Sequence, residues 1–96
     1  MKDFVRATRE APRIKAEYPA GTRILLNFMN DPLAPVPAGT RGTVCYVDDA
    51  GQIHMAWDNG RTLALICGED SFRKLTDEEV AQELEEQEEM GMDMRM

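Results

Sequence analysis

The sequence predicts a mainly β fold, in which a small five-stranded antiparallel sheet follows a short helix and precedes an acidic helix or tail. Between Gly39 and Leu75, short apolar runs alternate with the turn segments Asp-Asp-Ala-Gly, Asp-Asn-Gly and Gly-Glu-Asp-Ser, a pattern typical of strands joined by tight turns. The 96 residues have room for one small domain. We assign residues 19–75 to the sheet domain, residues 1–18 to a basic N-terminal segment and residues 76–96 to an acidic tail.

Charge is divided unevenly between the body and the tail. Residues 1–76 carry ten Lys and Arg against nine Asp and Glu, a net of +1, whereas residues 77–96 carry nine acids against Arg95 alone, a net of −8. The net charge of −7 is therefore a property of the tail. A nearly neutral body offers few contacts for nucleic-acid phosphates.

The N-terminal segment contains one short predicted helix. Pro12 lacks the amide that a helix interior needs, so we expect the helix to begin near Pro12 and to run to about Tyr18, where Pro19 ends it. Ile14 and Tyr18 are four residues apart and can dock this helix on the sheet. A basic arm that binds nucleic acid is the alternative, which the interleaved acids disfavour.

Ile24, Leu26 and Phe28 are expected on one face of the first strand. The segment 30–38 that follows contains three prolines, which exclude a central strand and predict a stiff loop. The five strands are predicted at residues 22–29, 42–47, 52–57, 61–66 and 72–75.

A five-residue sequence, Pro-Ala-Gly-Thr-Arg, occurs at 19–23 and again at 37–41. Each copy places a rigid proline before a glycine that tolerates unusual backbone angles, followed by a β-branched residue. We expect the same corner at the entrance of two strands.

The third and fourth strands predict a hairpin with two possible turns. A two-residue Asn59-Gly60 turn leaves Leu63 and Leu65 on the solvent side. A three-residue turn with Gly60 in the left-handed region instead gives one wholly apolar face, and we favour it. The favoured register pairs Met55 with Leu63 and Ile53 with Leu65, and places Arg61 opposite Trp57, where the guanidinium can rest on the indole.

Val44 and Val47 in the second strand are three residues apart, so strict alternation cannot bury both. Either a bulge separates them, or Cys45 and Val47 point inward while Val44 and Tyr46 point outward. We favour the bulge.

The acidic tail begins as a helix. Thr76 followed by Asp77-Glu78-Glu79 is typical of a capping box. Val80 and Leu84 form only a thin apolar stripe, and the glutamates that follow have no compensating base, so we expect fraying after about Gln87 and a flexible methionine-rich end up to Met96. A solvated end is favoured over a helix that docks a basic partner and over a nucleic-acid mimic.

The cysteine pattern and hydropathy predict a cytoplasmic protein. Cys45 and Cys67 form no C-x-x-C pair, so we interpret them as reduced, buried thiols. No apolar run approaches the roughly 18 residues of a membrane span. We expect no membrane association, no cofactor and no metal.

No catalytic constellation is apparent in the sequence. His54 is expected on the outward face of its strand without a second ligand, which is typical of a surface histidine. Asp48, Asp49 and Asp58 are better explained as turn caps than as catalytic carboxylates. Ser71 has no base at motif spacing. We therefore predict that the protein is not an enzyme.

Five short strands, a long loop after the first and a one-turn connector before the last resemble a small SH3-like barrel. The residues that carry a closer resemblance are Tyr18-Pro19-x-Gly21-Thr22-Arg23, Asn30-Asp31-Pro32, Gly42-Thr43-Val44, Val47-Asp48-Asp49, Gly51, Ile53-x-Met55-x-Trp57-Asp58-Asn59-Gly60, Gly68 and Phe72-Arg73-Lys74-Leu75. On these residues the chain resembles a bacterial and phage family described as domain of unknown function number 4314. That resemblance implies a small protein of phages or mobile elements without an assigned activity. Pro12 and the acidic tail look less typical of it.

The segment before Gly60 is also locally similar to the Mind bomb/Herc-type domain, an SH3-like barrel that binds peptide segments. A weaker similarity to KOW-type barrels implies the rival function, a nucleic-acid- or ribosome-associated barrel, which the charge disfavours.

We predict a non-enzymatic module that binds a protein or peptide in a groove bordered by the loop after the first strand. Trp57 leaves this site if its ring proves to be buried. The oligomeric state is open, because the apolar stripe of the tail and the exposed sheet edges permit a dimer without requiring one. The expected site residues are Asp31, Pro32, Tyr46, His54, Trp57 and Arg61.

Overall fold

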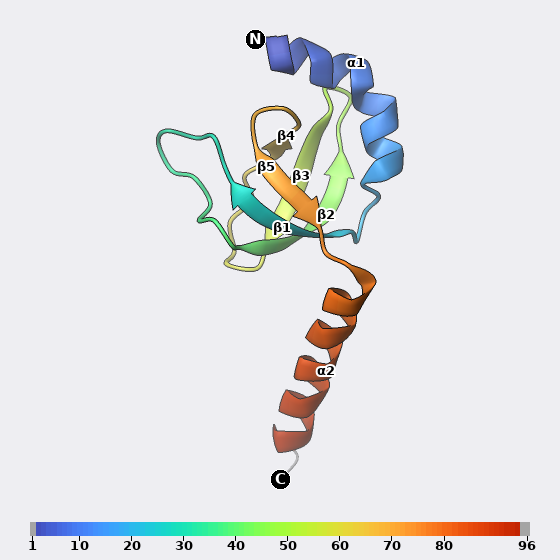
Figure 1. The fold of residues 1–96 in the computed structure, drawn as a ribbon, viewed down its shortest axis with the longest axis vertical. Helices are drawn as coiled ribbons and strands as arrows, with labels where there is room; N and C mark the ends of the chain where they lie inside the picture. The colour runs from blue at the N-terminus through green and yellow to red at the C-terminus, as the bar shows by residue number, and fades with distance from the viewer. Residues whose placement is uncertain (1, 95–96) are drawn as a thin grey trace.

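The computed structural model describes the backbone of residues 2–94 and the side chains of residues 8–87. The sheet lies between two helices, one at each end of the molecule (Figure 1). The elements in order are α1 (Lys2–Glu17), β1 (Arg23–Phe28), β2 (Arg41–Val47), β3 (Gln52–Trp57), β4 (Leu65–Ile66), β5 (Ser71–Lys74) and α2 (Asp77–Met94).

The five strands form one antiparallel sheet in the order β4-β3-β2-β1-β5. β1 therefore lies between β2 and the last strand, while β4 and β5 are the two edges. The edges do not pair with each other in the described chain, so the sheet is open. The mainly β fold with a helix at each end is confirmed.

The buried side chains of the core come from α1, from β1 to β4 and from the loop after β1, and Phe72 of β5 packs against them. Ile24, Leu26, Ile53 and Leu65 have no exposed surface, and Ile14 of α1 packs on them as predicted. Burial of such side chains stabilises a domain by about 1.5–3 kcal/mol each. The remaining cluster members are Met29, Val36, Val44, Val47, Met55 and Trp57.

The prediction that α1 begins near Pro12 is wrong. α1 starts ten residues earlier, at Lys2, and continues through Pro12 to Glu17. The proline ring lies on the exposed side, while Ala11 and Ile14 are buried against the sheet. This packing keeps the helix together across the missing amide, and the bend in α1 (Figure 1) is the deformation that an interior proline produces.

Phe28 does not share the inward face of β1 as predicted. It is 60% exposed, whereas the next residue, Met29, is buried. The register between β1 and β5 shifts between Leu26 and Phe28. This irregularity reverses the alternation of side chains and turns Phe28 to solvent.

The favoured bulge in β2 is confirmed. The register with β3 shifts between Val44 and Tyr46, and both Val44 and Val47 are buried. The same bulge turns Cys45 outward, so the prediction that both cysteines are buried is wrong: Cys45 is exposed and Cys67 is half-buried.

The hairpin turn has the predicted form. Gly60 has φ +90°, its amide donates to Trp57 O (2.9 Å), and Ile53 pairs with Leu65. The ladder is shorter than expected, however, because β4 contains only Leu65 and Ile66, and the predicted pair of Met55 with Leu63 is not part of it.

The repeated corner is also confirmed. Thr22 Oγ1 donates to Pro19 O and Thr40 Oγ1 to Pro37 O, both at 2.7 Å. The intervening glycines have positive φ values, which side chains with a Cβ rarely adopt.

α2 starts with the predicted capping box. Thr76 N donates to Glu79 Oε1 (2.8 Å), and Glu79 N donates to Thr76 Oγ1 (3.1 Å). α2 then continues to Met94, past the expected fraying point at Gln87. Glutamate is a good helix former, and repulsion between neighbouring carboxylates costs only a few tenths of a kcal/mol per pair. Met96 lies outside the described residues.

Candidate functional site

A groove of about 300 Å³ lies between the loop after β1 and the segment that leads into and out of β4. We call it the loop groove. Two of the six expected site residues, Asp31 and Pro32, line it. Its other wall is mostly apolar. The lining includes Asp31, Pro32, Leu63, Ala64, Ile66 and Asp70.

The loop beside this groove is held in one conformation by its own polar groups. Asp31 Oδ1 accepts the amides of Leu33 (2.8 Å) and Ala34 (3.2 Å), and these hydrogen bonds lower the pKa of Asp31, with a smaller contribution from the Arg61 charge. Arg61 Nη2 donates to Ala34 O. Val36, 1% exposed, anchors the far side of the loop in the core.

Asp70 joins the two walls of the loop groove. Its Oδ1 accepts the amide of Asn30, and its Oδ2 accepts the amide of Ile66, both at 2.8 Å. One carboxylate thus fixes the loop after β1 to the end of β4.

The backbone between the hairpin turn and β4 precedes the edge strand and lies outside the ladder with β3. The amides of Thr62, Leu63 and Ala64 donate no hydrogen bond within residues 8–87. Leu63 O accepts Trp57 Nε1 (2.8 Å), which fixes this segment against the core.

Tyr46 and His54 form a second group, on β2 and β3. Their rings are stacked, with centroids 4.3 Å apart and planes 6° from parallel, and Tyr46 is 56% exposed. A 2.8 Å hydrogen bond joins His54 Nε2 to Asp48 Oδ2. Neither Tyr46 nor His54 lines the loop groove, although Asp48 Oδ1 accepts the amide of Gln52, which does line it.

Asp48 combines two roles. Burial raises its pKa, but the hydrogen bonds from His54 and from the amides of Gln52 and Ala50 outweigh that effect, so the pKa of Asp48 lies below its ordinary value. The hydrogen bonds from the amides of Gln52 (2.9 Å) and Ala50 (3.0 Å) form the turn cap that the sequence predicts.

Trp57 belongs to the core and leaves the predicted site. It is 3% exposed, and a buried ring is not accessible to a partner. The predicted stacking of Arg61 on its indole is wrong, because the Arg61 guanidinium reaches across to the carbonyl of Ala34 instead. The structure therefore brings Asp31, Pro32 and Arg61 together around the loop and leaves Tyr46 and His54 apart from them.

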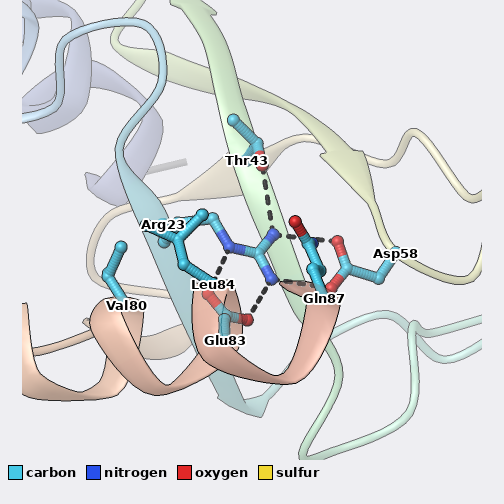
Figure 2. A pocket seen from close by; sticks show the side chains of 7 residues that line it. All are labelled: Arg23, Thr43, Asp58, Val80, Glu83, Leu84 and Gln87. Carbon is cyan, nitrogen blue, oxygen red and sulfur yellow. Dashed lines mark hydrogen bonds and ion pairs between the residues drawn. The ribbon is translucent and has the colours of Figure 1, made fainter. Parts of the chain in front are cut away.

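One cluster was not predicted from the sequence: the Arg23 clamp, made of Arg23, Thr43, Asp58 and Glu83 (Figure 2). Arg23 donates two hydrogen bonds to Asp58 (2.7 and 2.8 Å), two to Glu83 (2.5 and 3.1 Å) and one to Thr43 Oγ1 (3.1 Å). These five bonds match the five N–H groups of a guanidinium. The clamp ties β1, β2, the hairpin turn and α2 together.

Charges in the clamp stabilise one another. The hydrogen bonds to Asp58 and Glu83 raise the pKa of Arg23, and those from Arg23 lower the pKa of Asp58 and of Glu83. Arg41 Nη1 lies 3.3 Å from Glu83 Oε2 and adds to this effect. Asp58 is thus an ion-pair partner, not the turn cap that its position in the sequence indicates. The clamp residues are up to 60 positions apart, and no local pattern reveals them.

Beside the clamp, a cleft of about 500 Å³ lies between α2 and the sheet, and we call it the α2 cleft. Its helix side is lined by Val80, Leu84 and Gln87 (Figure 2).

Within the described residues, no group of three or more His, Cys, Asp and Glu side chains is placed to hold a metal ion. No helix in that part of the chain has the length and apolar character needed to cross a membrane.

One protein-family model, described as a domain of unknown function (DUF4314), matches residues 8–75. The match starts ten residues before Tyr18, so it includes Pro12 and the second half of α1, and it stops before α2. No curated protein and no solved structure matches the chain.

Proposed function

We infer the function from one premise: the chain belongs to the DUF4314 family, a domain of unknown function, and so inherits no activity from it. We propose that the protein is a non-enzymatic interaction module, with its sheet curled as an SH3-like barrel, that binds an extended segment of a partner protein in the loop groove. A phage or mobile-element origin and a cytoplasmic location stay predictions from the sequence.

The strand order supports the barrel. β1 pairs with both β2 and β5, so the first and last strands are neighbours. The two edges, β4 and β5, are joined by residues 67–70, where Cys67 and Asp70 form an isolated bridge. A twisted sheet with this order curls its edges toward each other into a partly open barrel.

The observation that carries the binding proposal is the coincidence of a groove with unpaired backbone amides. Thr62, Leu63 and Ala64 offer N–H groups next to β4, an edge strand of the sheet. An extended peptide that pairs with such an edge gains main-chain hydrogen bonds, while an adjacent groove selects its side chains. Leu63, Ala64 and Ile66 provide an apolar surface for one of them.

The charges of the loop groove indicate which peptides fit it. Asp31 and Asp70 line the groove, and neither forms an ion pair with a described side chain within 4.0 Å. We therefore propose an extended segment with an apolar residue in the groove and a Lys or Arg beside it, facing Asp31.

The test is selection of peptides from a random displayed library, followed by titration of the best binder into the ¹⁵N-labelled chain. We expect amide shifts to cluster at Asp31, Leu63 and Ala64, and Asp31→Asn to weaken binding several-fold. Asparagine keeps the oxygen that accepts the loop amides, so this substitution removes charge and not structure. Tyr46→Ala, outside the groove, should leave the affinity unchanged. An empty selection, or shifts clustered elsewhere, would refute the proposal.

One observation favours the nucleic-acid alternative: the exposed Tyr46–His54 stack offers an aromatic surface on which a base can lie. The nearly neutral body opposes it. Titration with duplex DNA, single-stranded DNA and structured RNA at two salt concentrations separates the two functions. Micromolar binding that weakens steeply with salt and is lost in Tyr46→Ala would replace the peptide proposal.

A further inference from the structure

Within the described residues, the hydrogen bonds and ion pairs that hold α2 on the sheet come from two of its glutamates. Glu79 receives two hydrogen bonds from Arg73 (2.8 and 3.0 Å), and Glu83 sits between Arg23 and Arg41. Both glutamates lie one turn apart on the docking side of the helix. The clamp thus fixes the direction of α2, while about 500 Å³ beside it stays unfilled.

The helix side of the cleft has the geometry of a helix-packing surface. Val80, Glu83, Leu84 and Gln87 line it, at spacings i, i+3, i+4 and i+7, which place side chains on one face of a helix. Leu84 is 56% exposed and Val80 is partly exposed. A second helix laid along this stripe covers both apolar side chains.

Charge identifies the kind of helix that fits. Residues 77–94 contain nine acids and no base, so α2 of a second copy would bring like charges against like. α1 of a second copy cannot present its apolar face to the cleft, since Ala11 and Ile14 are buried against its own sheet. Asp58 and Glu83 in the cleft are already paired with Arg23, so it is the other acids of α2 that complement Lys and Arg.

From these observations we propose that the α2 cleft docks a basic amphipathic helix of a partner protein, with the Arg23 clamp holding α2 at the angle that keeps the cleft open. This second surface is separate from the loop groove and does not depend on it. The apolar face of the partner helix covers Val80 and Leu84, and its basic flanks face the acids of α2.

The experiment uses the full chain and two synthetic 18-residue peptides of one composition, Leu and Lys. In the first, Leu recurs at i, i+3, i+4 and i+7; in the second, Leu is distributed so that no apolar face forms. Isothermal titration should show binding of the first peptide and at least tenfold weaker binding of the second.

Two pairs of variants locate the site. Leu84→Ser should weaken binding of the first peptide about tenfold, the change in affinity that corresponds to burying roughly half a leucine side chain. Leu33→Ser removes the same side chain from the loop after β1 and should leave the affinity unchanged. Glu83→Gln, which removes the charge of Glu83 and one of its two acceptor oxygens from the clamp, should weaken binding more than Glu85→Gln, which removes the same charge from an exposed position outside the cleft.

Circular dichroism confirms that each variant is folded. Equal binding of the two peptides would show that α2 attracts them by charge alone, and would overturn the proposal. So would a Leu84→Ser chain that binds like the wild type, or sedimentation showing a wild-type dimer that this substitution dissociates.

Discussion

Gly42→Ala is the substitution for which the structure gives the clearest magnitude. A Cβ added at Gly42 lies 2.7 Å from Cε3 of Trp57 and 3.1 Å from the carbonyl oxygen of Ala56. Ordinary contact begins at 3.4 Å, so a gap of 0.7 Å must be opened. The indole cannot withdraw easily, because it is 3% exposed and its Nε1 is bonded to Leu63 O.

Overpacking of this kind costs about 1–3 kcal/mol. A domain of this size loses about 4–8 °C in Tm per kcal/mol, so a cost of about 2 kcal/mol lowers Tm by about 8–16 °C. Urea unfolding followed by the fluorescence of Trp57, the single tryptophan, measures the free energy directly.

Gly39→Ala is the matched control for Gly42→Ala. Nothing lies within 4 Å of a Cβ at Gly39, but its φ is +88°, so its cost is conformational, about 1 kcal/mol. A Gly42→Ala chain as stable as the wild type would refute the steric argument. Gly42 and Trp57 serve the fold and not the loop groove, so the folded fraction of the Gly42→Ala chain should bind the library-selected peptide as tightly as the wild type does.

Three further predictions follow from single contacts. A thiol reagent should modify exposed Cys45 well before Cys67, whose pKa is raised by burial; equal rates contradict the described bulge. Arg73→Gln should raise the pKa of Glu79 from about 2 toward its ordinary 4.5 in a carboxyl NMR titration. Because folding lowers this pKa, the contribution of the ion pair to the stability of the wild type is complete above pH 4.5 and disappears as pH falls toward 2. An unchanged pKa in the variant would show that the ion pair is absent. Pro12→Ala should raise the free energy of unfolding by about 1 kcal/mol or more, since it restores a helix amide at an exposed position; a loss of stability in urea unfolding would contradict a continuous α1.

Features that local chemistry decides were predictable from the sequence. The Pro-Ala-Gly-Thr corners, the turn ending at Gly60 and the cap at Thr76 all depend on residues within five positions of one another. The bulge in β2 was also predictable, because only a bulge buries both Val44 and Val47.

Features decided by distant contacts were not predictable. Phe28 faces solvent because the register with β5 shifts beside it, and Pro12 is tolerated because its neighbours Ala11 and Ile14 pack on the sheet. For the site, the sequence predicted the loop with Asp31 and Pro32, but a buried tryptophan and an exposed one have the same local pattern.

The saturated guanidinium of Arg23 has an evolutionary consequence. The family match ends at residue 75, so Thr43 and Asp58 belong to the shared domain while Glu83 does not. The Nε–H and one Nη2–H of Arg23 are satisfied only by Glu83. Lysine, with three donors on one nitrogen, cannot reproduce the arrangement. We therefore expect covariation: relatives whose chains lack an acid at this place should also have lost the arginine, or should supply another acceptor for the two N–H groups it leaves behind.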